Sequence, residues 1–389
     1  MTTEIQRPTL RQWGCLLGLT AAATVYNTSE FLPTALLTSI GESLGVSESG
    51  VGMVISTYAW VVTLLSLPLM ILASRLSMRR LLLWVLGLFT LLQLATGLSQ
   101  GYWALMASRM GVACVHALFW AIVAPLAVRQ MPEAWHGVAL GTLSVGSSVA
   151  MVLGIPLGRA LGLHVGWRGA FLTLGALAAV LFLALLPALP PTPKEKAFTF
   201  GEVPGLLKNR TLLKIYGATM LALGGYYCWN SYLDAFLLKT AGLTPNTITG
   251  IFTVLGFASV GGGVLYTLVS RRCNRLLELG ILAIGIPLLA LLPAAHSLAL
   301  TALFCALPAI GFTLFNVSCQ SDVVSSTQGS ASAVAMAIFS ALFNLGVAAG
   351  TLLGAGVCDI ASLGWTAPVG GVVALLALAA TLLGQSKKA

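Results

Sequence analysis

Glu30 is the only charged residue in the apolar stretch Ala21–Leu37, and the whole chain holds 11 acidic residues among 389. A carboxylate on a membrane-spanning helix costs about 2.5–3.5 kcal/mol on insertion scales, and such acids usually mark proton relays or substrate pathways. If this stretch crosses a membrane, Glu30 is the first candidate for taking up and releasing a proton.

Arg109, His116 and Trp120 share one face of an apolar segment at residues 103–128, at helical spacing. At 1.5 Å per residue, Glu30 lies about 27 Å into the first segment and Arg109 about 9 Å into this one, which runs the opposite way. The two side chains reach similar depth, so we expect an electrostatic couple that can load and release a proton. A static ion pair is the alternative. His116 is either a hydrogen-bonded core residue, a proton site or a partner for a substrate hydroxyl.

A second polar group follows in the later part of the chain. Tyr227, Asn230 and Asp234 fall at i, i+3 and i+7, on one face of a helix. Asp234 is a candidate second proton site, or else it marks the outer end of that helix. Amides in a membrane need partners and therefore face the protein interior, where they bind substrate or bond neighbouring helices. The candidate substrate-binding residues are Asn27, Tyr58, His116, Trp120, Tyr227, Asn230, Asn316, Gln320 and Asn344.

Enzyme chemistry finds little support in the sequence. The four histidines are isolated, H-E-x-x-H does not occur, and the seven cysteines form no C-x-x-C pair. Gly97–Gly101 fits G-x-S-x-G, but it lies at a helix end and not at a strand-to-helix elbow. We therefore expect no catalytic residues, no metal and no cofactor, and we expect a proton gradient to supply the energy.

The composition is that of a membrane protein. The chain is 58% hydrophobic and 8% charged, whereas a soluble domain carries about 25% charged residues. The first apolar segment is long and lacks a clear small-residue cleavage site, so we do not expect a cleaved signal peptide. At about 20 residues per span, the sequence predicts twelve helices, at 13–36, 47–73, 81–98, 103–128, 137–162, 168–189, 212–238, 246–269, 276–293, 298–321, 331–357 and 366–384.

The basic residues predict the orientation. With the N-terminus in the cytoplasm, 16 of the 20 Lys and Arg residues fall on the inside, while Arg159, Arg168 and Lys239 fall outside and Arg109 lies within a span. The positive-inside rule therefore favours an even number of spans with both termini cytoplasmic. Anionic lipid accounts for the net charge of +9, so we expect the bilayer and no nucleic acid as a partner.

The two halves of the chain resemble each other at an offset of about 196 residues. Ala150, Gly154 and Gly158 match Gly346, Gly350 and Gly354, and Ser74-Arg75 matches Ser270-Arg271. Six spans per half give repeats related by a pseudo-two-fold axis along the membrane normal, as in transporters with a midplane site. We expect an N-terminal bundle at 1–190, a Pro-rich basic cytoplasmic linker at 191–210 and a C-terminal bundle at 211–389. The small residues predict close helix packing, either within a bundle or at an interface that opens and closes.

Several motifs resemble those of a known family. Asn27–Pro33 is similar to the first helix of proton-coupled drug and sugar exporters of the major facilitator superfamily, and Ser108–Ala113 with His116 and Trp120 is closer to bacterial sugar efflux transporters. Gly154-Ile155-Pro156-Leu157-Gly158 resembles the antiporter signature of the fifth helix. Where that family carries Asp and Gly before Arg79-Arg80, this chain has Arg75 and Met78.

The resemblance implies an all-α transporter with twelve transmembrane helices in two bundles. It implies a proton-coupled antiporter in the bacterial inner membrane that exports a sugar or another small amphiphile, with multidrug or nucleoside efflux as the alternative. We expect a monomer. The residues implied in conformational change are Arg79, Arg80, Gly154, Pro156, Gly158, Gly346, Gly350 and Gly354.

Overall fold

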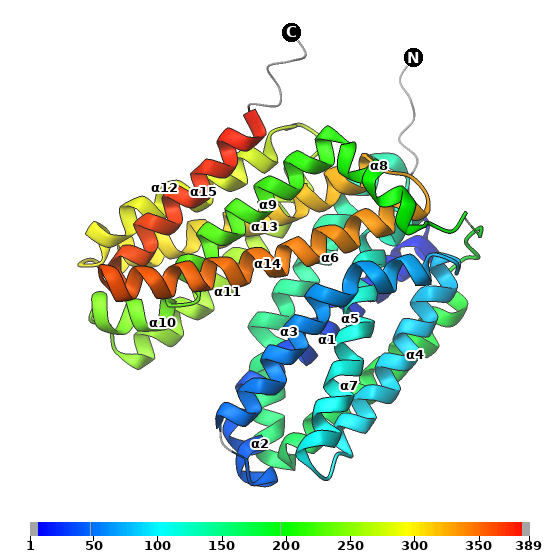
Figure 1. Cartoon of the computed structure of the whole chain (residues 1–389), viewed down its shortest axis with the longest axis horizontal. Helices are drawn as coiled ribbons and strands as arrows, with labels where there is room; N and C mark the ends of the chain where they lie inside the picture. The colour runs from blue at the N-terminus through cyan, green and yellow to red at the C-terminus, as the bar shows by residue number, and fades with distance from the viewer. Residues whose placement is uncertain (1–6, 47, 195, 383–389) are drawn as a thin grey trace. The chain divides into compact units, whose positions relative to one another are not determined.

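Helices make up all the regular structure of the residues that the computed structural model describes, which are 7–46, 48–194 and 196–382; no strand occurs among them (Figure 1). Nine helices in this described part are long and apolar enough to cross a membrane, and Leu363–Ala379 is a shorter apolar helix. The all-helical architecture is the one that the composition predicts, because backbone groups in lipid must be satisfied within the segment.

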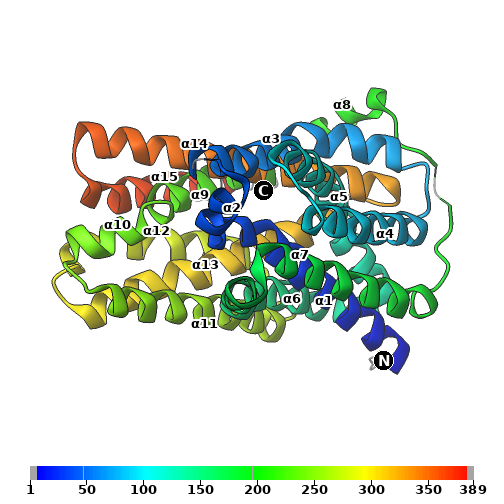
Figure 2. The ribbon, with the colours of Figure 1, turned by 90° about the horizontal axis from the view of Figure 1, so that it is seen from below.

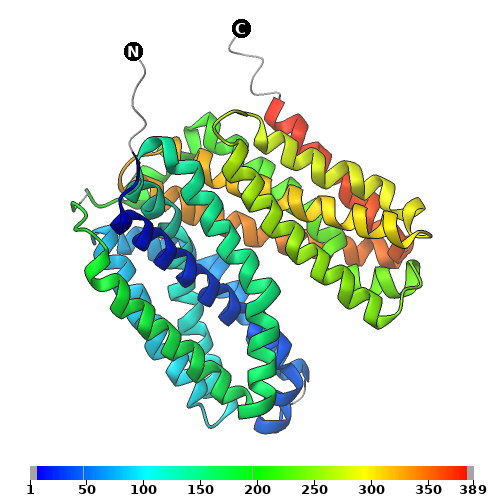
Figure 3. The same ribbon diagram turned by 180° about the vertical axis from the view of Figure 1, so that it is seen from behind.

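The first compact unit comprises Met1–Glu202 together with Thr327–Ala341. Its helices up to the linker are α1 (Leu10–Ala35), α2 (Leu37–Leu44), α3 (Glu48–Ala73), α4 (Met78–Gly97), α5 (Tyr102–Gln130), α6 (His136–Val149) and α7 (Ile155–Ala188). A short 3₁₀ turn, Glu133–Trp135, precedes α6, and a π-helical turn, Ala150–Gly154, joins α6 to α7. Within this unit α1 packs on α6 and α7, and α4 packs on α5 and α7 (Figures 2 and 3).

The second compact unit comprises Val203–Ser326 and Leu342–Ala389. Its helices are α8 (Val203–Lys208), α9 (Arg210–Asn230), α10 (Leu233–Ala235), α11 (Pro245–Val269), α12 (Leu276–Ala294), α13 (Leu298–Ser325), the larger part of α14 (Ser330–Ile360) and α15 (Thr366–Leu382). The π-helical turn Phe236–Thr240 follows α10. The residues Thr327–Ala341, which contain the first turns of α14, pack with the first unit, so this one helix contributes to both.

Three predicted spans differ from the structure in continuity. The expected spans 137–162 and 168–189 form one helical run with a break at Gly166, whose φ of 78° is open to glycine at little cost. The expected span 212–238 is interrupted, because α9 ends at Asn230 and a turn at residues 231–232 precedes α10. Asp234 therefore does not continue the helical face of Tyr227 and Asn230.

The expected linker 191–210 contains short helices as well as irregular chain. A 3₁₀ turn, Phe200–Glu202, and α8 lie inside it, and the boundary between the two compact units falls between them. Residues 190–194 and 196–199 have no regular structure.

The small residues of the fifth and eleventh spans allow helices to approach closely within each unit. A side chain at Gly154 would meet Thr28 Oγ1, and one at Gly158 would come within 2.9 Å of Leu32 Cδ1. In the second unit, a side chain at Gly350 would meet the Gly224 carbonyl, and one at Gly354 would meet that of Cys228. Gly350 and Gly354 follow Gly154 and Gly158 by 196 residues each. Their partners Gly224 and Cys228 follow Thr28 and Leu32 by the same number. The internal repeat therefore reproduces the same helix contacts in both halves, as close backbone packing requires.

Arginine side chains bind the carbonyl groups at the C-terminal end of α7. Arg79 Nε donates to the Leu189 carbonyl at 2.9 Å and Nη2 to that of Leu186 at 2.8 Å, while Arg11 Nε donates to that of Ala188 at 3.0 Å. The last carbonyls of a helix lack partners within it, and cations there also interact favourably with the helix dipole. Arg79 thus secures the start of the linker, whereas Arg80 is exposed.

Candidate functional site

Glu30 and His116 face each other within the first unit. Glu30 Oε2 on α1 lies 3.6 Å from His116 Nε2 on α5. The His116 side chain is 6% exposed and that of Glu30 is 25% exposed, so the carboxyl group is the more accessible member of the pair. The two atoms are within ion-pair range but beyond hydrogen-bond distance, and each group can take up or release a proton by itself.

Arg109 is buried on α5. It binds Ser29, the residue before Glu30 on α1, and does not bind Glu30 itself. Its Nη1 donates to Ser29 Oγ at 3.1 Å and its Nη2 to the Ser29 carbonyl at 3.0 Å. No salt bridge within 4.0 Å joins Arg109 to Glu30 among the described side chains. The two groups therefore lie at matching depth, as the helix arithmetic predicts, but the contacts of Arg109 run through the neighbouring residue.

Aromatic rings enclose this polar group. The guanidinium carbon of Arg109 lies 4.9 Å from the ring centroid of Tyr58 and 5.6 Å from that of Phe171, in cation–π contact. The His116 ring lies 5.5 Å from the Tyr58 ring and 6.2 Å from the Trp120 ring. Tyr58 and Trp120 are thus brought together with Glu30 and His116, while Asn27 is buried three residues before Glu30 on α1.

Two residues of the site, Ser29 and Gln93, were not identified from the sequence. Gln93 Nε2 on α4 donates to Ser29 Oγ, the atom that also accepts from Arg109. Both side chains are fully buried, and they link α1, α4 and α5. Gln93 is the only amide in an otherwise apolar run from Leu81 to Ala95, and this was the feature that could have identified it.

Buried polar atoms without a hydrogen-bond partner among the described residues gather in the same place. They are Tyr58 Oη, Gln93 Oε1, Arg109 Nε and His116 Nδ1. An unpartnered buried polar atom costs about 1–3 kcal/mol. Four of them on His116 and on side chains that contact Ser29 or His116 indicate that water or a ligand completes this site, because the protein alone leaves its donors and acceptors unused.

The candidates from the second half lie in the second unit. The Tyr226 ring stacks on Phe312 with centroids 4.7 Å apart, and Tyr227 and Phe343 contact the same Phe312 ring at 6.2 and 6.1 Å. Asn316, one turn after Phe312 on α13, has a buried Oδ1 without a partner among the described residues. Asn230 and Gln320 are half-buried, and so is Asn344 on α14. The Asp234 side chain lies outside the described part of the structure.

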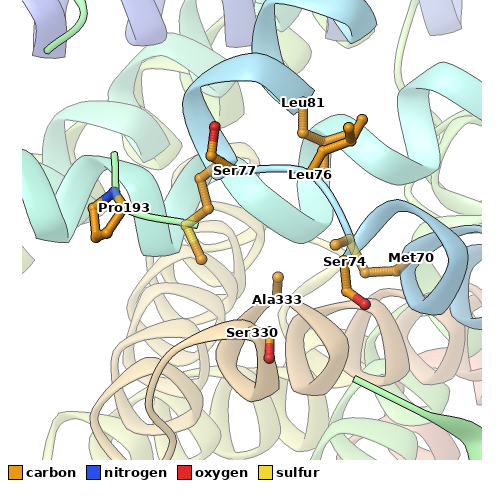
Figure 4. Close-up of a pocket in the computed structure, with 9 residues that line it drawn as sticks. Met70, Ser74, Leu76, Ser77, Leu81, Pro193, Ser330 and Ala333 are labelled. Carbon is orange, nitrogen blue, oxygen red and sulfur yellow. The ribbon is translucent and has the colours of Figure 1, made fainter. Parts of the chain in front are cut away.

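The linker binds the loop between α3 and α4. Ser74 Oγ accepts from the Phe198 amide at 3.0 Å and donates to the Phe198 carbonyl at 3.3 Å, and Thr192 Oγ1 accepts from the Arg79 amide at 3.0 Å. Ser330 Oγ donates to the Lys196 carbonyl at 2.7 Å. These segments border a small pocket that Figure 4 shows, lined by Met70, Ser74, Leu76, Ser77, Met78, Leu81, Pro193, Ser330 and Ala333. Backbone and hydroxyl groups thus form this junction, where Arg75 and Met78 stand in place of the family's Asp and Gly.

Metal chemistry has no site in the described part of the chain, where no group of three or more His, Cys, Asp or Glu side chains is placed to hold an ion. The chemistry available at Glu30, His116 and Arg109 is proton transfer and hydrogen bonding to a polar ligand.

Comparison with known proteins gives a consistent assignment. The profile of the Major Facilitator Superfamily matches residues 17–336. Curated proteins named probable sugar efflux transporter, from Helicobacter pylori (strain G27) and Helicobacter acinonychis (strain Sheeba), are each 36% identical over 358 residues, which cover 92% of this chain and 91% of each relative.

Solved structures agree on the fold. A variant of the E. coli fucose:proton symporter FucP matches with a TM-score of 0.75 at 14% identity, over 95% of this chain and 98% of FucP. The human organic anion transporter MFSD10 matches with a TM-score of 0.77 at 18% identity, over 96% of this chain and all of its own. At these identities the likeness concerns the arrangement of helices and not the substrate.

Proposed function

This chain belongs to the Major Facilitator Superfamily, and from that premise we propose that it is a proton-driven antiporter that exports sugars, such as arabinose or thiogalactosides, from the bacterial cytoplasm. Membership makes it a multi-pass membrane transporter rather than an enzyme, with twelve transmembrane helices in two six-helix bundles. Within the described residues, twelve helical segments correspond to those spans when α7 is divided at Gly166.

The observation that carries the proton-coupled part of the proposal is the pairing of Glu30 with His116 at 3.6 Å beside buried Arg109. An acid on a membrane-spanning helix that faces an imidazole and stays partly accessible has the chemistry of a proton carrier. A proton would bind this pair when the transporter is open to the outside. It would be released into the cytoplasm when the transporter opens to the inside, and the sugar would move the opposite way by the same alternating access. Energy then comes from the gradient, and no cofactor takes part.

Sugar as the substrate class rests on the names of the 36% identical relatives and on the polar inventory of the two units. Amides such as Asn316 and Gln320 can donate to and accept from hydroxyl groups, and the rings of Tyr58, Trp120 and Tyr227 offer faces for the apolar side of a sugar. A dedicated anion site would call for more buried cations than Arg109.

Multidrug or nucleoside efflux by the same fold is the second candidate. The stack of Tyr226 on Phe312, with Tyr227 and Phe343 around it, favours this alternative because it presents an aromatic surface to a flat apolar ligand. The proposed setting is the inner membrane with both termini in the cytoplasm. In this orientation 16 of the 20 basic residues lie on the cytoplasmic side, as the positive-inside rule favours. The proposed functional state is a monomer.

Purified protein in proteoliposomes with an imposed pH gradient tests the proposal. Gradient-driven movement of labelled L-arabinose or a thiogalactoside is expected in wild type and is expected to be lost in Glu30→Gln, which keeps the shape of the side chain but cannot ionise. Glu42→Gln, at an exposed position in α2, is the matched control. Gradient-driven transport that is equal in Glu30→Gln and wild type would exclude Glu30 as the coupling site.

Two further measurements separate the alternatives. Counterflow, in which substrate on the far side accelerates uptake, distinguishes a carrier from a pore. A panel that includes nucleosides and cationic drugs distinguishes the second candidate, since a gradient response to these compounds and not to sugars would replace sugar as the substrate class.

A further inference from the structure

Pro33 leaves a carbonyl group of α1 without its normal partner inside the helix. In an α-helix the carbonyl of residue 29 accepts from the amide of residue 33, but proline has no N–H. An unpaired backbone carbonyl buried in a membrane protein must find another donor. That carbonyl belongs to Ser29, the residue immediately before Glu30.

Arg109 supplies the missing donor. Its Nη2 lies 3.0 Å from the Ser29 carbonyl oxygen, and its Nη1 lies 3.1 Å from Ser29 Oγ. Gln93 Nε2 donates to the same Oγ from α4 and so holds the hydroxyl group in place. The guanidinium is thus bound by two oxygens of one residue on α1, which sets both its distance and its direction.

We propose that Pro33 is a positioning residue for transport: it frees the Ser29 carbonyl to hold Arg109, and this keeps Arg109 from pairing with Glu30, so that the carboxyl group stays available to His116. Gln93 assists by fixing the Ser29 hydroxyl. The inference rests on the proposed proton-coupled function. It adds a reason why Arg109 is held on Ser29 while Glu30 faces His116.

The surroundings of Glu30 favour this arrangement. The titratable or charged groups that face the site are His116 and Arg109 from α5, Tyr58 from α3 and Tyr26 from α1. Arg109 is the one permanent cation among these groups, and a guanidinium that is released from Ser29 would find the Glu30 carboxylate on the next residue. A direct ion pair would then hold Glu30 in its charged form and compete with proton binding.

The substitution Pro33→Ala tests the inference, because it restores the amide N–H that competes with Arg109 for the Ser29 carbonyl. Alanine is the best helix former, so this variant is expected to fold. Its gradient-driven sugar transport in proteoliposomes is expected to fall by about tenfold relative to counterflow, as for the loss of one hydrogen bond to a charged group. The pH profile of transport is expected to change as well.

Pro68→Ala is the matched control. Pro68 also lies inside a spanning helix, α3, and the carbonyl it leaves free is that of Leu64, whose side chain is exposed. This variant is expected to keep the wild-type ratio of gradient-driven transport to counterflow and the wild-type pH profile.

Ser29→Ala and Gln93→Leu complete the series. Ser29→Ala removes Oγ but keeps the carbonyl, so a smaller loss is expected, and the double variant Pro33→Ala, Ser29→Ala is expected to lose most. If Pro33→Ala does not fold, the inference is tested by the ratio of gradient-driven transport to counterflow in Ser29→Ala and Gln93→Leu. Ratios and pH profiles equal to wild type and to Pro68→Ala would overturn the inference, whereas a wild-type protein without gradient-driven transport would overturn the proposed function itself.

Discussion

The Tyr226 ring stacks on the Phe312 ring at 4.7 Å, and these two residues follow Glu30 and His116 by 196 positions each. The same two places in the repeated fold therefore hold a carboxylate and an imidazole in the first half and two stacked aromatic rings in the second. At the same offset, Arg109 corresponds to Cys305 and Ser29 to Gly225. The proton chemistry available in the first half has no equivalent at these positions of the second.

This relationship predicts a variant that removes the charges and keeps the fold. Glu30→Tyr with His116→Phe places in the first half the pair that the second half already accommodates. We expect a folded protein whose sugar transport no longer responds to a pH gradient, measured by thermal unfolding and by proteoliposome transport. Retained gradient-driven export in this double variant would place the coupling site elsewhere.

Close packing at Gly350 predicts a strong effect of a single methyl group. Gly350→Ala would push a Cβ against the Gly224 carbonyl, and overpacking of this kind costs about 1–3 kcal/mol. Gly356→Ala on the same helix α14 meets nothing within 4 Å and is the control, expected to be neutral or stabilising by up to about 1 kcal/mol. Thermal unfolding in detergent measures both, and equal melting temperatures would contradict the close approach.

The contact between Ser74 and Phe198 predicts protection of the linker. Ser74→Ala removes the side chain that accepts from the Phe198 amide and donates to its carbonyl. Each such bond contributes about 0.5–1.5 kcal/mol, so trypsin is expected to cut after Lys194 or Lys196 several-fold faster. Ser77→Ala, which lines the same pocket, is the control, and equal cleavage rates in the two variants would show that Ser74 does not hold the linker.

Glu202 predicts a pH dependence in the linker. The Thr199 amide and hydroxyl both donate to Glu202 Oε2, at 2.8 and 2.9 Å, and they lower the pKa of this carboxyl group below its ordinary value of 4.5. A lowered pKa stabilises the turn fully above the unfolded value, and the gain is lost as the pH falls through the folded value. Hydrogen-exchange protection of the Thr199 amide is therefore expected to hold at neutral pH and to decline below pH 4.5. In Glu202→Gln, whose amide oxygen still accepts but does not titrate, protection is expected to be independent of pH; the same decline in both proteins would exclude this carboxyl as its cause.

Hydropathy predicted most of the spans, because the cost of polar groups in lipid acts on every residue of a span. The break at Gly166 falls in the predicted gap between the spans 137–162 and 168–189, whereas the turn after Asn230 was not predicted, since it depends on tertiary packing. Glu30 and His116 could be singled out because charged and imidazole groups are rare in apolar helices. Gln93 could have been singled out in the same way, as the single amide of its apolar run, but Ser29 could not, because a serine is common in such helices and its role depends on the partners that the fold brings to it.

Because α14 contributes its first turns to the first unit and the rest to the second, the order of synthesis differs from the order of assembly. A ribosome releases α9, α11, α12 and α13 before it reaches Thr327–Ala341, the last piece of the first unit. The first six spans can enter the bilayer early, but their unit remains incomplete until most of the second half has been translated. A chain truncated before residue 327 would therefore lack the last piece of the first unit, although every one of the six N-terminal spans is present.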